Sequence, residues 1–394
     1  MTRSPGRALM VVLAVVLAVP PASHARQYAD VEAAVRAGIR QGVFPGAAVV
    51  IGRRDTVLYA RGFGRFTWAA NSAVPSADST LWDVASLTKV VATASVAMRL
   101  ADRGQLDLDT PVARFLPRFT GGGRERVTVR MLLDHTSGLP AFAPLYQDAE
   151  TREAAIARLW EVPLRRLPGR SPDYSDLNAI LLALAMEAIT GQPFDELVHQ
   201  EVFEPLGMTE TLFAPPASLR RRIAPSMRDS RGPIAGRPSD PNAFALGGVA
   251  GHAGVFATAA DLARFAQAWL RQGHHPGGGT WVSPLTLRQF LERGTQSGTR
   301  MLGWDSPRDV VPRNTTTSFG SLATALTYGH TGWSGTSMWI DPASDLFMIL
   351  LTNRSYDPRV RNSLVAIRDV RHAVSNAART SVLAQCQLVA EVRC

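Results

Sequence analysis

The chain has 394 residues, of which 46% are hydrophobic and 19% are charged, as in an ordinary globular protein with a sizeable core. The formal net charge is +9, but the basic residues are scattered. We find no zinc-finger spacing, no phosphate loop and no basic patch interleaved with aromatic residues, so the sequence argues against nucleic-acid binding. We expect no cofactor and no metal.

The first 25 residues have the pattern of a secretory signal. Arg3 and Arg7 form a charged segment, residues 8–19 are apolar, and Ser23-His24-Ala25 ends on a small residue suited to cleavage. This apolar run is too short to span a bilayer, and no later run reaches the roughly 18 apolar residues of a membrane helix. We therefore expect a mature chain of about residues 26–394, without a membrane span, in the periplasm or secreted.

Both ends of the mature chain are predicted to form strands. Residues 30–40 have the apolar spacing of a helix, and residues 46–64 (GAAVVIGRRDTVLYARGFG) predict a hairpin around an Arg-Asp turn. Residues 335–354 (GTSMWIDPASDLFMILLTNR) predict a second hairpin, with Asp341-Pro342 opening its turn. A last helix is expected over about residues 360–376.

Between the two hairpins the chain is mostly helical, and no alternating strand–helix repeat is present. This pattern predicts an α+β protein in which the termini meet to build an antiparallel sheet flanked by helices. The expected sheet subdomain comprises about residues 26–85 and 311–394. The expected large helical insert comprises about residues 86–310.

Lys89 is the only lysine among 42 basic residues, and it follows Ser86 by three positions. An apolar stripe over residues 90–101, stopped by Gly104, predicts that both lie at the start of a helix and face the same side. An amine beside a hydroxyl can act as its base only if it can lose a proton, which lysine can do and arginine cannot. We therefore predict that Ser86 is a nucleophile activated by Lys89. The alternative is a capping serine followed by an exposed lysine.

A tyrosine is a candidate for the third group that relays the proton. Three of the six tyrosines begin a Tyr-x-Asp triplet: Tyr28, Tyr146 and Tyr174. Tyr28 lies at the start of the mature chain, and Tyr146 precedes an acidic helix expected on the surface. Tyr174 directly precedes residues 177–191 (LNAILLALAMEAITG), a strongly apolar predicted helix, so its side chain can face a cleft at a loop-to-helix junction. We choose Tyr174.

Nearly the whole mature chain resembles the serine β-lactamase and penicillin-binding protein superfamily. The likeness is to the branch that contains class C β-lactamases, D-alanyl-D-alanine carboxypeptidases and related esterases. The resemblance implies a β-lactamase/transpeptidase-like fold. Four segments carry it: Ser86-Leu87-Thr88-Lys89 as the nucleophile motif, LLDHTSGLP (132–140) as a loop common in the branch, Tyr174-Ser175-Asp176 as the second motif, and GHTGWSGTSMWIDP (329–342) as the third.

By this resemblance, Ser86 would attack a carbonyl carbon and form an acyl-enzyme. Lys89 and Tyr174 would shuttle the proton. The backbone N–H groups of Ser86 and Trp333 would form the oxyanion hole, and water would then release the acyl group.

The third motif would line the cleft with His330, Thr331 and Gly332. This sequence departs from the usual β-lactamase pattern twice. Asp176 replaces an asparagine, and its charge would hold Lys89 protonated. His330 replaces a lysine and would give only partial positive charge at neutral pH, so a permanent carboxylate anchor is missing. As replacement anchors we considered three arginines: Arg354, Arg359 and Arg361.

Residues 239–265 (SDPNAFALGGVAGHAGVFATAADLARF) are similar to a segment in periplasmic carboxypeptidases of the penicillin-binding protein 4B type and in exported muramyl-peptide amidases. By that similarity, Asp240 and Asn242 would line the site. We expect His135 and His252 to fix loops by hydrogen bonding rather than to act in catalysis.

The sequence thus predicts an exported serine hydrolase that acts through an acyl-enzyme on a peptide or amide derived from the cell wall, like a D-alanyl-D-alanine carboxypeptidase. A carboxylesterase or weak β-lactamase is the alternative. A penicillin-binding sensor without turnover is an alternative of another class. Substrates would be peptidoglycan fragments or small esters and amides. The oligomeric state and a disulfide between Cys386 and Cys394 stay open.

Overall fold

A five-stranded antiparallel sheet with the strand order β2-β1-β10-β9-β8 joins the two ends of the chain in this computed structural model. The structure describes residues 27–276, 278–294, 296–307 and 317–388. The expected signal segment and Cys394 lie outside the described residues, as does the Cys386 side chain, so the disulfide is not tested. The strands are β1 (Gly46–Gly52), β2 (Val57–Gly64), β8 (Tyr328–Thr331), β9 (Ser337–Asp341) and β10 (Leu346–Thr352).

The central strand β10 and its neighbour β1 come from opposite ends of the sequence, and every residue in both is buried. Val49 of β1 pairs with Leu350 of β10. Strands covered on both faces have continuous apolar runs, as these two do. Their side chains alternate between two cores: Val49 and Leu350 belong to one, while Val50 and Ile349 belong to the other.

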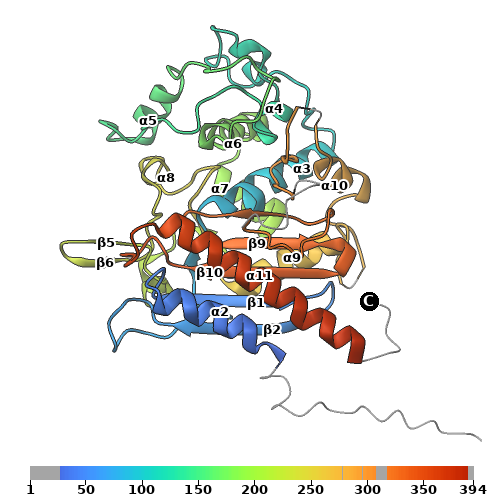
Figure 1. Cartoon of the computed structure of the whole chain (residues 1–394). Helices are drawn as coiled ribbons and strands as arrows, with labels where there is room; N and C mark the ends of the chain where they lie inside the picture. The colour runs from blue at the N-terminus through green and yellow to red at the C-terminus, as the bar shows by residue number, and fades with distance from the viewer. Residues whose placement is uncertain (1–26, 277, 295, 308–316, 389–394) are drawn as a thin grey trace, which may run out of the picture.

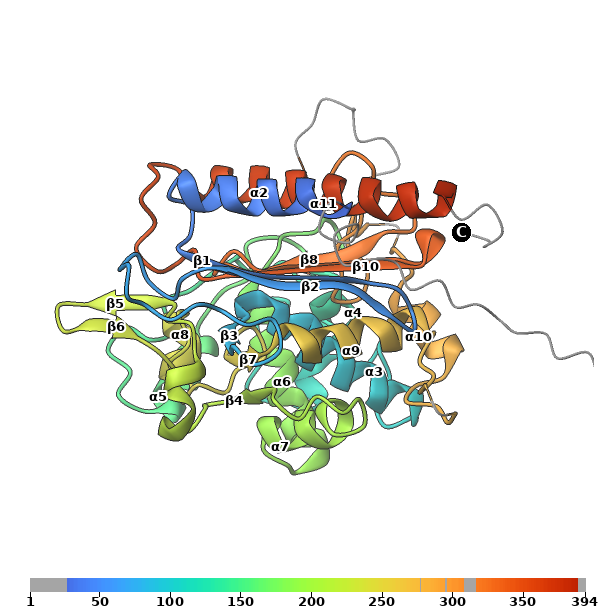
Figure 2. The same ribbon diagram turned by 90° about the horizontal axis from the view of Figure 1, so that it is seen from below.

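Helices α2 (Ala29–Arg40) and α11 (Ser363–Leu388) lie side by side over one face of the sheet (Figure 2). They cover the core that contains Val49 and Leu350. The helix expected over residues 30–40 is confirmed, but the last helix is longer than predicted. Its apolar stripe continues with one residue at every fourth position, all buried in this core: Val370, Val374, Ala378 and Val382.

The other face of the sheet carries the helical half of the chain (Figures 1 and 2). Helix α9 (Ala259–Leu270) packs directly on β1, β9 and β10, although it belongs to the expected insert. Thr258 begins it by accepting the Asp261 N–H at 3.1 Å. The other α-helices are α3 (Ser95–Asp102), α4 (Val129–Leu133), α5 (Arg152–Leu159), α6 (Asp176–Thr190), α7 (Phe194–Val198), α8 (Pro241–Ala245) and α10 (Pro284–Phe290).

Short elements complete the fold. A three-stranded sheet has the order β3-β7-β4, and a separate hairpin joins β5 to β6. These strands are β3 (Trp82–Asp83), β4 (Leu212–Phe213), β5 (Met227–Asp229), β6 (Gly232–Ile234) and β7 (Val255–Ala257). The 3₁₀ helices are η1 (Ala85–Leu87), η3 (Val112–Arg114), η4 (Arg124–Arg126), η6 (Ala217–Arg222) and η7 (Pro342–Ser344), and the π-helices are η2 (Lys89–Ala94) and η5 (His199–Phe203).

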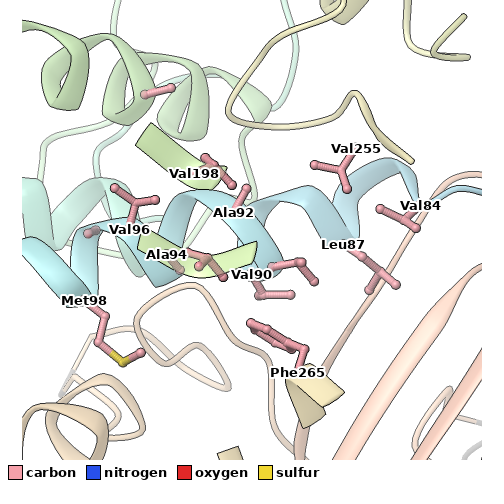
Figure 3. Close-up of a cluster of buried hydrophobic side chains, with 14 of the residues drawn as sticks. Val84, Leu87, Val90, Ala92, Ala94, Val96, Met98, Val198, Val255 and Phe265 are labelled. Carbon is pink, nitrogen blue, oxygen red and sulfur yellow. The ribbon is translucent and has the colours of Figure 1, made fainter. Parts of the chain in front are cut away.

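The helix predicted after Ser86 is three helical segments in succession, η1, η2 and α3, and Gly104 follows the last of them with φ +70°. Every residue of η2 is buried, so this segment runs through the core rather than along its edge. Figure 3 shows Ala92 pointing toward Val198 and Val90 pointing toward Phe265, on different sides of this segment. Single π-helical turns occur mostly inside α-helices and are frequent at functional sites.

Among the described residues, no single helix is both long and apolar enough to cross a membrane. Helix α6 and residues 194–203 meet the length and composition criteria only when taken together, and the chain bends by 86° between them. The predicted α+β class, with an antiparallel sheet built from both termini, is confirmed.

Candidate active site

The chain enters the site through a strained residue. Ala85 has φ +49°, in the left-handed region, which costs a non-glycine residue about 1–2 kcal/mol. Its N–H donates to Asp83 Oδ1 at 2.9 Å, and Asp83 Oδ2 accepts the Ser239 N–H at 2.7 Å. Burial raises the pKa of Asp83. Asp83 thus stabilises the turn before Ser86 and links it by a hydrogen bond to the loop that contains Ser239, which also lines the cavity described below.

Lys89 lies directly beneath Ser86. Its Nζ donates to Ser86 Oγ at 3.0 Å and to the backbone oxygen of His252 at 3.1 Å. The lysine is 3% exposed, so it is not the exposed surface residue of the alternative interpretation. The spacing of three places the hydroxyl and the amine on one side of the helix, as the sequence predicted.

Asp176 is the nearest charged partner of Lys89, with Oδ1 2.7 Å from Nζ. Burial acts to lower the pKa of Lys89, but the carboxylate of Asp176 and the phenol of Tyr174 outweigh it, so the pKa is raised overall. The ground state therefore contains an ammonium, as expected for an aspartate at this position. Desolvation alone does not free the amine.

Tyr174 packs over the same ammonium. The centre of its ring lies 5.0 Å from Lys89 Nζ, 5.8 Å from the His330 ring centre and 4.7 Å from that of His135. The other two Tyr-x-Asp tyrosines lie elsewhere. Tyr28 is fully buried against Tyr59 in the core beneath α2 and α11, and Tyr146 is largely exposed.

His135 positions the second motif. It has φ +62°, and its Nδ1 accepts hydrogen bonds from Ser175 N–H and from Asn178 Nδ2, both at 3.1 Å. Burial holds its pKa well below 6.5, so the ring is neutral. The second histidine expected to fix a loop, His252, contacts Asp240 Oδ1 through Nε2 at 2.8 Å.

A cavity of about 750 Å³ opens above Ser86. Lys89 lies under it, in contact with Ser86. The predicted residues that line it are Ser86, Tyr174, Asp176, Asp240, His330, Thr331, Gly332 and Trp333.

Asn242 is not at the cavity, which corrects the sequence-based expectation. It is fully buried, its Oδ1 accepts the Tyr146 N–H at 3.1 Å, and its Nδ2 donates to Ala143 O at 2.9 Å. Asp240 caps α8 by accepting the Ala243 N–H at 2.8 Å, and the first turn of this helix then carries Asn242 away from the cavity. Asn242 therefore links the start of α8 to the loop that contains Ala143 and Tyr146.

His330 does not supply positive charge. It is buried, its Nδ1–H donates to Thr331 O at 2.8 Å, and burial together with the charges of Arg300 and Lys89 holds its pKa well below 6.5. Its Nε2 has no partner among the described residues. The expected partial positive charge is therefore wrong for this environment, and the ring presents a hydrogen-bond acceptor.

Two other arginines line the cavity instead of the three considered as anchors. Arg300 lies over the Tyr174 ring, with Cζ 5.0 Å from the ring centre, and Arg371 lies below the third motif. Arg354, Arg359 and Arg361 do not line the cavity. No sequence signal distinguished Arg300 and Arg371 from the other arginines.

The turn from β8 to β9 is hydrogen-bonded to the turn that precedes Ser86. Ser334 Oγ donates to Asp83 O at 2.7 Å, and Thr336 Oγ1 donates to Val84 O at 2.9 Å. A Cβ at Gly332 would lie 2.2 Å from Thr336 Oγ1 and 2.6 Å from Val84 O, so only glycine fits there.

The two backbone donors expected to form an oxyanion hole are free to meet a ligand. Trp333 N–H has no acceptor among the described residues. Ser86 is the second residue of η1, in the first turn, where N–H groups have no intrahelical acceptor. In the described part of the chain, no group of three acidic, histidine or cysteine side chains could hold a metal.

Residues 31–371 match the family model described as Beta-lactamase. The chain belongs to the beta-lactamase family. A curated relative from Escherichia coli (strain K12) is named "Putative D-alanyl-D-alanine carboxypeptidase". It is 29% identical over 352 residues, and the match covers 80% of each chain.

Two solved structures illustrate the family fold. A beta-lactamase from Sulfitobacter sp. EE-36 has a TM-score of 0.73 at 22% identity, over 92% of this chain and 99% of that one. EstCE1, a hydrolase with promiscuous acyltransferase activity, has a TM-score of 0.71 at 22% identity, over 90% and 100%. The predicted superfamily and its β-lactamase/transpeptidase-like fold are confirmed. This member of the beta-lactamase family shares the fold of that family's serine hydrolases.

Proposed function

We propose that the protein is an exported serine hydrolase that forms an acyl-enzyme on Ser86 with a peptide or amide derived from the cell wall, like a D-alanyl-D-alanine carboxypeptidase. The 3.0 Å contact between Ser86 Oγ and Lys89 Nζ at the floor of a 750 Å³ cavity carries the proposal. The name of the E. coli relative supports the substrate class.

In the proposed reaction, Ser86 Oγ bonds to the substrate carbonyl carbon as its proton passes to Lys89 Nζ. Because Asp176 holds Lys89 as an ammonium, the amine must first lose a proton, which favours high pH. Tyr174, above the amine, would pass a proton to the departing nitrogen as the carbon–nitrogen bond breaks. Water would then attack the acyl carbon and give one proton to the Tyr174 phenolate. The bond between the acyl carbon and Ser86 Oγ would break, and Lys89 would return the hydroxyl proton to Oγ.

Substrate recognition would combine one cation with a neutral acceptor. Arg300 is one of the two arginines that line the cavity and lies beside Tyr174, so it would pair with a carboxylate on the substrate. Thr331 would add a hydroxyl donor, and neutral His330 would accept a hydrogen bond from a substrate N–H.

A carboxylesterase or weak β-lactamase is the second candidate. The neutral His330 favours it, because a carboxylate-binding lysine is absent and an ester oxygen leaves with less need of a proton than an amide nitrogen. Time-resolved intact-mass measurements with a D-Ala-D-Ala peptide, a penicillin and a p-nitrophenyl ester separate the candidates. Turnover of the peptide supports the carboxypeptidase, and turnover of the ester alone supports the esterase.

The same experiment tests the sensor hypothesis. A penicillin adduct that stays for hours without product would show acylation without hydrolysis and would contradict the proposed turnover.

We also propose a periplasmic or secreted location, supported by the signal pattern of residues 1–25. The N-terminal sequence of protein recovered from the periplasm or medium tests it. A start near residue 26 is expected, and an uncleaved cytoplasmic chain would overturn the proposal.

A further inference from the structure

All carbonyl groups of the β8–β9 turn, residues 332–336, point to hydrogen-bond donors within the protein. Gly332 O accepts Gly335 N–H at 3.0 Å and Arg371 Nη2 at 2.8 Å. Thr336 O accepts Gly332 N–H at 2.8 Å and Arg371 Nη2 at 2.9 Å. Gly335 O accepts Arg371 Nε at 3.3 Å. Three of the five carbonyls thus share one guanidinium.

The other two carbonyls are held by β10 and its end. Trp333 O accepts Arg354 Nε at 2.9 Å, and Ser334 O accepts Arg354 N–H and Thr352 Oγ1, both at 2.7 Å. The turn therefore presents its carbonyl side to β10 and α11.

The orientation of one peptide group follows from these bonds. In a planar trans peptide, the C=O and the N–H point in opposite directions. Gly332 C=O points to Arg371 on α11, so Trp333 N–H points the other way. Gly332 and Trp333 both line the cavity, and Trp333 N–H has no acceptor among the described residues. Arg371 and Gly335 N–H together hold this peptide group so that Trp333 N–H points away from them.

Arg371 is an unusual buried cation. It is 7% exposed and has no acidic partner in the part of the chain that the structure describes. Burial lowers its pKa to about 9, so it keeps its charge at neutral pH. A buried charge without a counter-ion opposes folding. Moreover, Gly332 O and Thr336 O each accept a hydrogen bond from a backbone N–H as well. Neither oxygen would therefore be left without a hydrogen bond if Arg371 were absent.

We propose that Arg371 is a positioning residue for the acyl transfer proposed above: it fixes and polarises the Gly332–Trp333 peptide, so that Trp333 N–H stabilises the negative oxygen of the tetrahedral intermediate. A hydrogen bond from a charged donor is roughly twice as strong as one between neutral groups. A chain of such bonds strengthens each member, by about 10–30%. The guanidinium thereby makes Trp333 N–H a stronger donor toward the developing charge. The inference rests on the proposed function of Ser86.

The test compares Arg371→Met with a matched variant on the same helix. Arg379→Met also removes a buried guanidinium from α11, but Arg379 binds Asp341 and Thr327 Oγ1, not the turn. The readouts are kcat and KM for an uncharged p-nitrophenyl ester, and the dissociation constant of phenylboronic acid, which forms a tetrahedral adduct on a reactive serine.

For Arg371→Met we expect kcat to fall about 10- to 100-fold, up to the effect of deleting one oxyanion donor, with KM nearly unchanged. The boronate dissociation constant should rise by a similar factor. Arg371→Lys keeps the charge without the planar fork and should lose less. Arg379→Met should lower the melting temperature and leave kcat and boronate affinity unchanged.

Unchanged kcat and boronate affinity in Arg371→Met would overturn the inference while leaving the proposed function intact. A rise in KM alone would also overturn it, because Arg371 would then bind substrate directly. If Arg371→Met does not fold, Arg371→Lys decides by the same readouts. If the wild-type protein reacts with neither the ester nor the boronate, the proposed function itself fails.

Discussion

Asp176 Oδ1 lies 2.7 Å from Lys89 Nζ, and Ser86 Oγ lies 3.0 Å from the same nitrogen. Lys89 Nζ therefore donates to the hydroxyl that it is proposed to activate and also pairs with the Asp176 carboxylate. This carboxylate stabilises the protonated form of the lysine. A β-lactamase usually has an uncharged asparagine in the place of Asp176. The charge state of Lys89 is thus the variable that sets the pH range of activity.

Asp176→Asn should move the ascending limb of the kcat/KM profile to lower pH. Burial lowers the pKa of Lys89 and the Asp176 charge raises it, so removing that charge leaves burial opposed only by Tyr174. Because neutral Lys89 is the reactive form in the proposed reaction, a lower pKa means activity at lower pH. Initial rates with a neutral ester between pH 5 and 10 measure the shift. A limb that stays in place or moves to higher pH would contradict the role of Asp176.

Lys89→Arg should reduce acylation of Ser86 about 10²- to 10⁴-fold, the usual contribution of a positioned base, although the positive charge is kept. Paired with the Asp176 carboxylate, an arginine at this position would keep its proton and could not act as the base. Stopped-flow acylation with a p-nitrophenyl ester measures the rate, and the melting temperature shows that the variant is folded. Full activity would mean that no neutral amine is needed.

The sequence predicted the parts of this site that depend on local pattern. A single lysine three residues after a serine identified Ser86 and Lys89, and the apolar helix after Tyr174 distinguished it from Tyr28 and Tyr146. The two hairpins were visible because one strand of each, β1 and β10, is a continuous apolar run next to turn residues. The sequence also predicted that the two terminal hairpins lie in one sheet, because it showed no other strands of similar length.

Other features depend on residues far apart in the chain. Burial, together with the nearby charges of Arg300 and Lys89, holds the pKa of His330 well below 6.5, and its neighbours in sequence reveal neither cause. The Asn242 side chain does not reach the cavity because α8 begins directly after Asp240. The left-handed conformation of Ala85 has no composition signal, since alanine rarely adopts it.

Stability should fall as the pH drops below about 6.5, in part through His135. Burial holds the pKa of His135 well below 6.5 in the folded state, whereas the unfolded chain takes up the proton near 6.5. Acid therefore favours unfolding, by up to about 1.4 kcal/mol per pH unit for this group. Urea unfolding at pH 7, 6 and 5 measures the slope.

His135→Asn is the control for that slope, because asparagine tolerates the φ of +62° and does not titrate. The variant should be less stable at pH 7 and lose less stability on acidification. An identical slope in both proteins would show that His135 is not the source.

Gly332→Ala should destabilise the protein by about 1–3 kcal/mol and strongly reduce activity, because the new methyl group would lie 2.6 Å from the backbone oxygen of Val84. Moving this turn displaces Trp333 N–H. Gly104→Ala is the matched control: Gly104 has φ +70° and nothing within 4 Å of a new Cβ, so only backbone strain is added. Equal activity losses in both variants would argue against the clash as the cause.

The covalent state of Ser86 tests the account most directly. Wild-type protein and Ser86→Ala would be mixed with a p-nitrophenyl ester, a labelled penicillin and a D-Ala-D-Ala peptide, quenched in acid after milliseconds to minutes, and weighed intact. We predict that the wild-type mass rises by one acyl group, mapped to Ser86 by peptide sequencing, and that Ser86→Ala gains none. No adduct with any of the three acyl donors, or an equal adduct in Ser86→Ala, would contradict the acyl-enzyme.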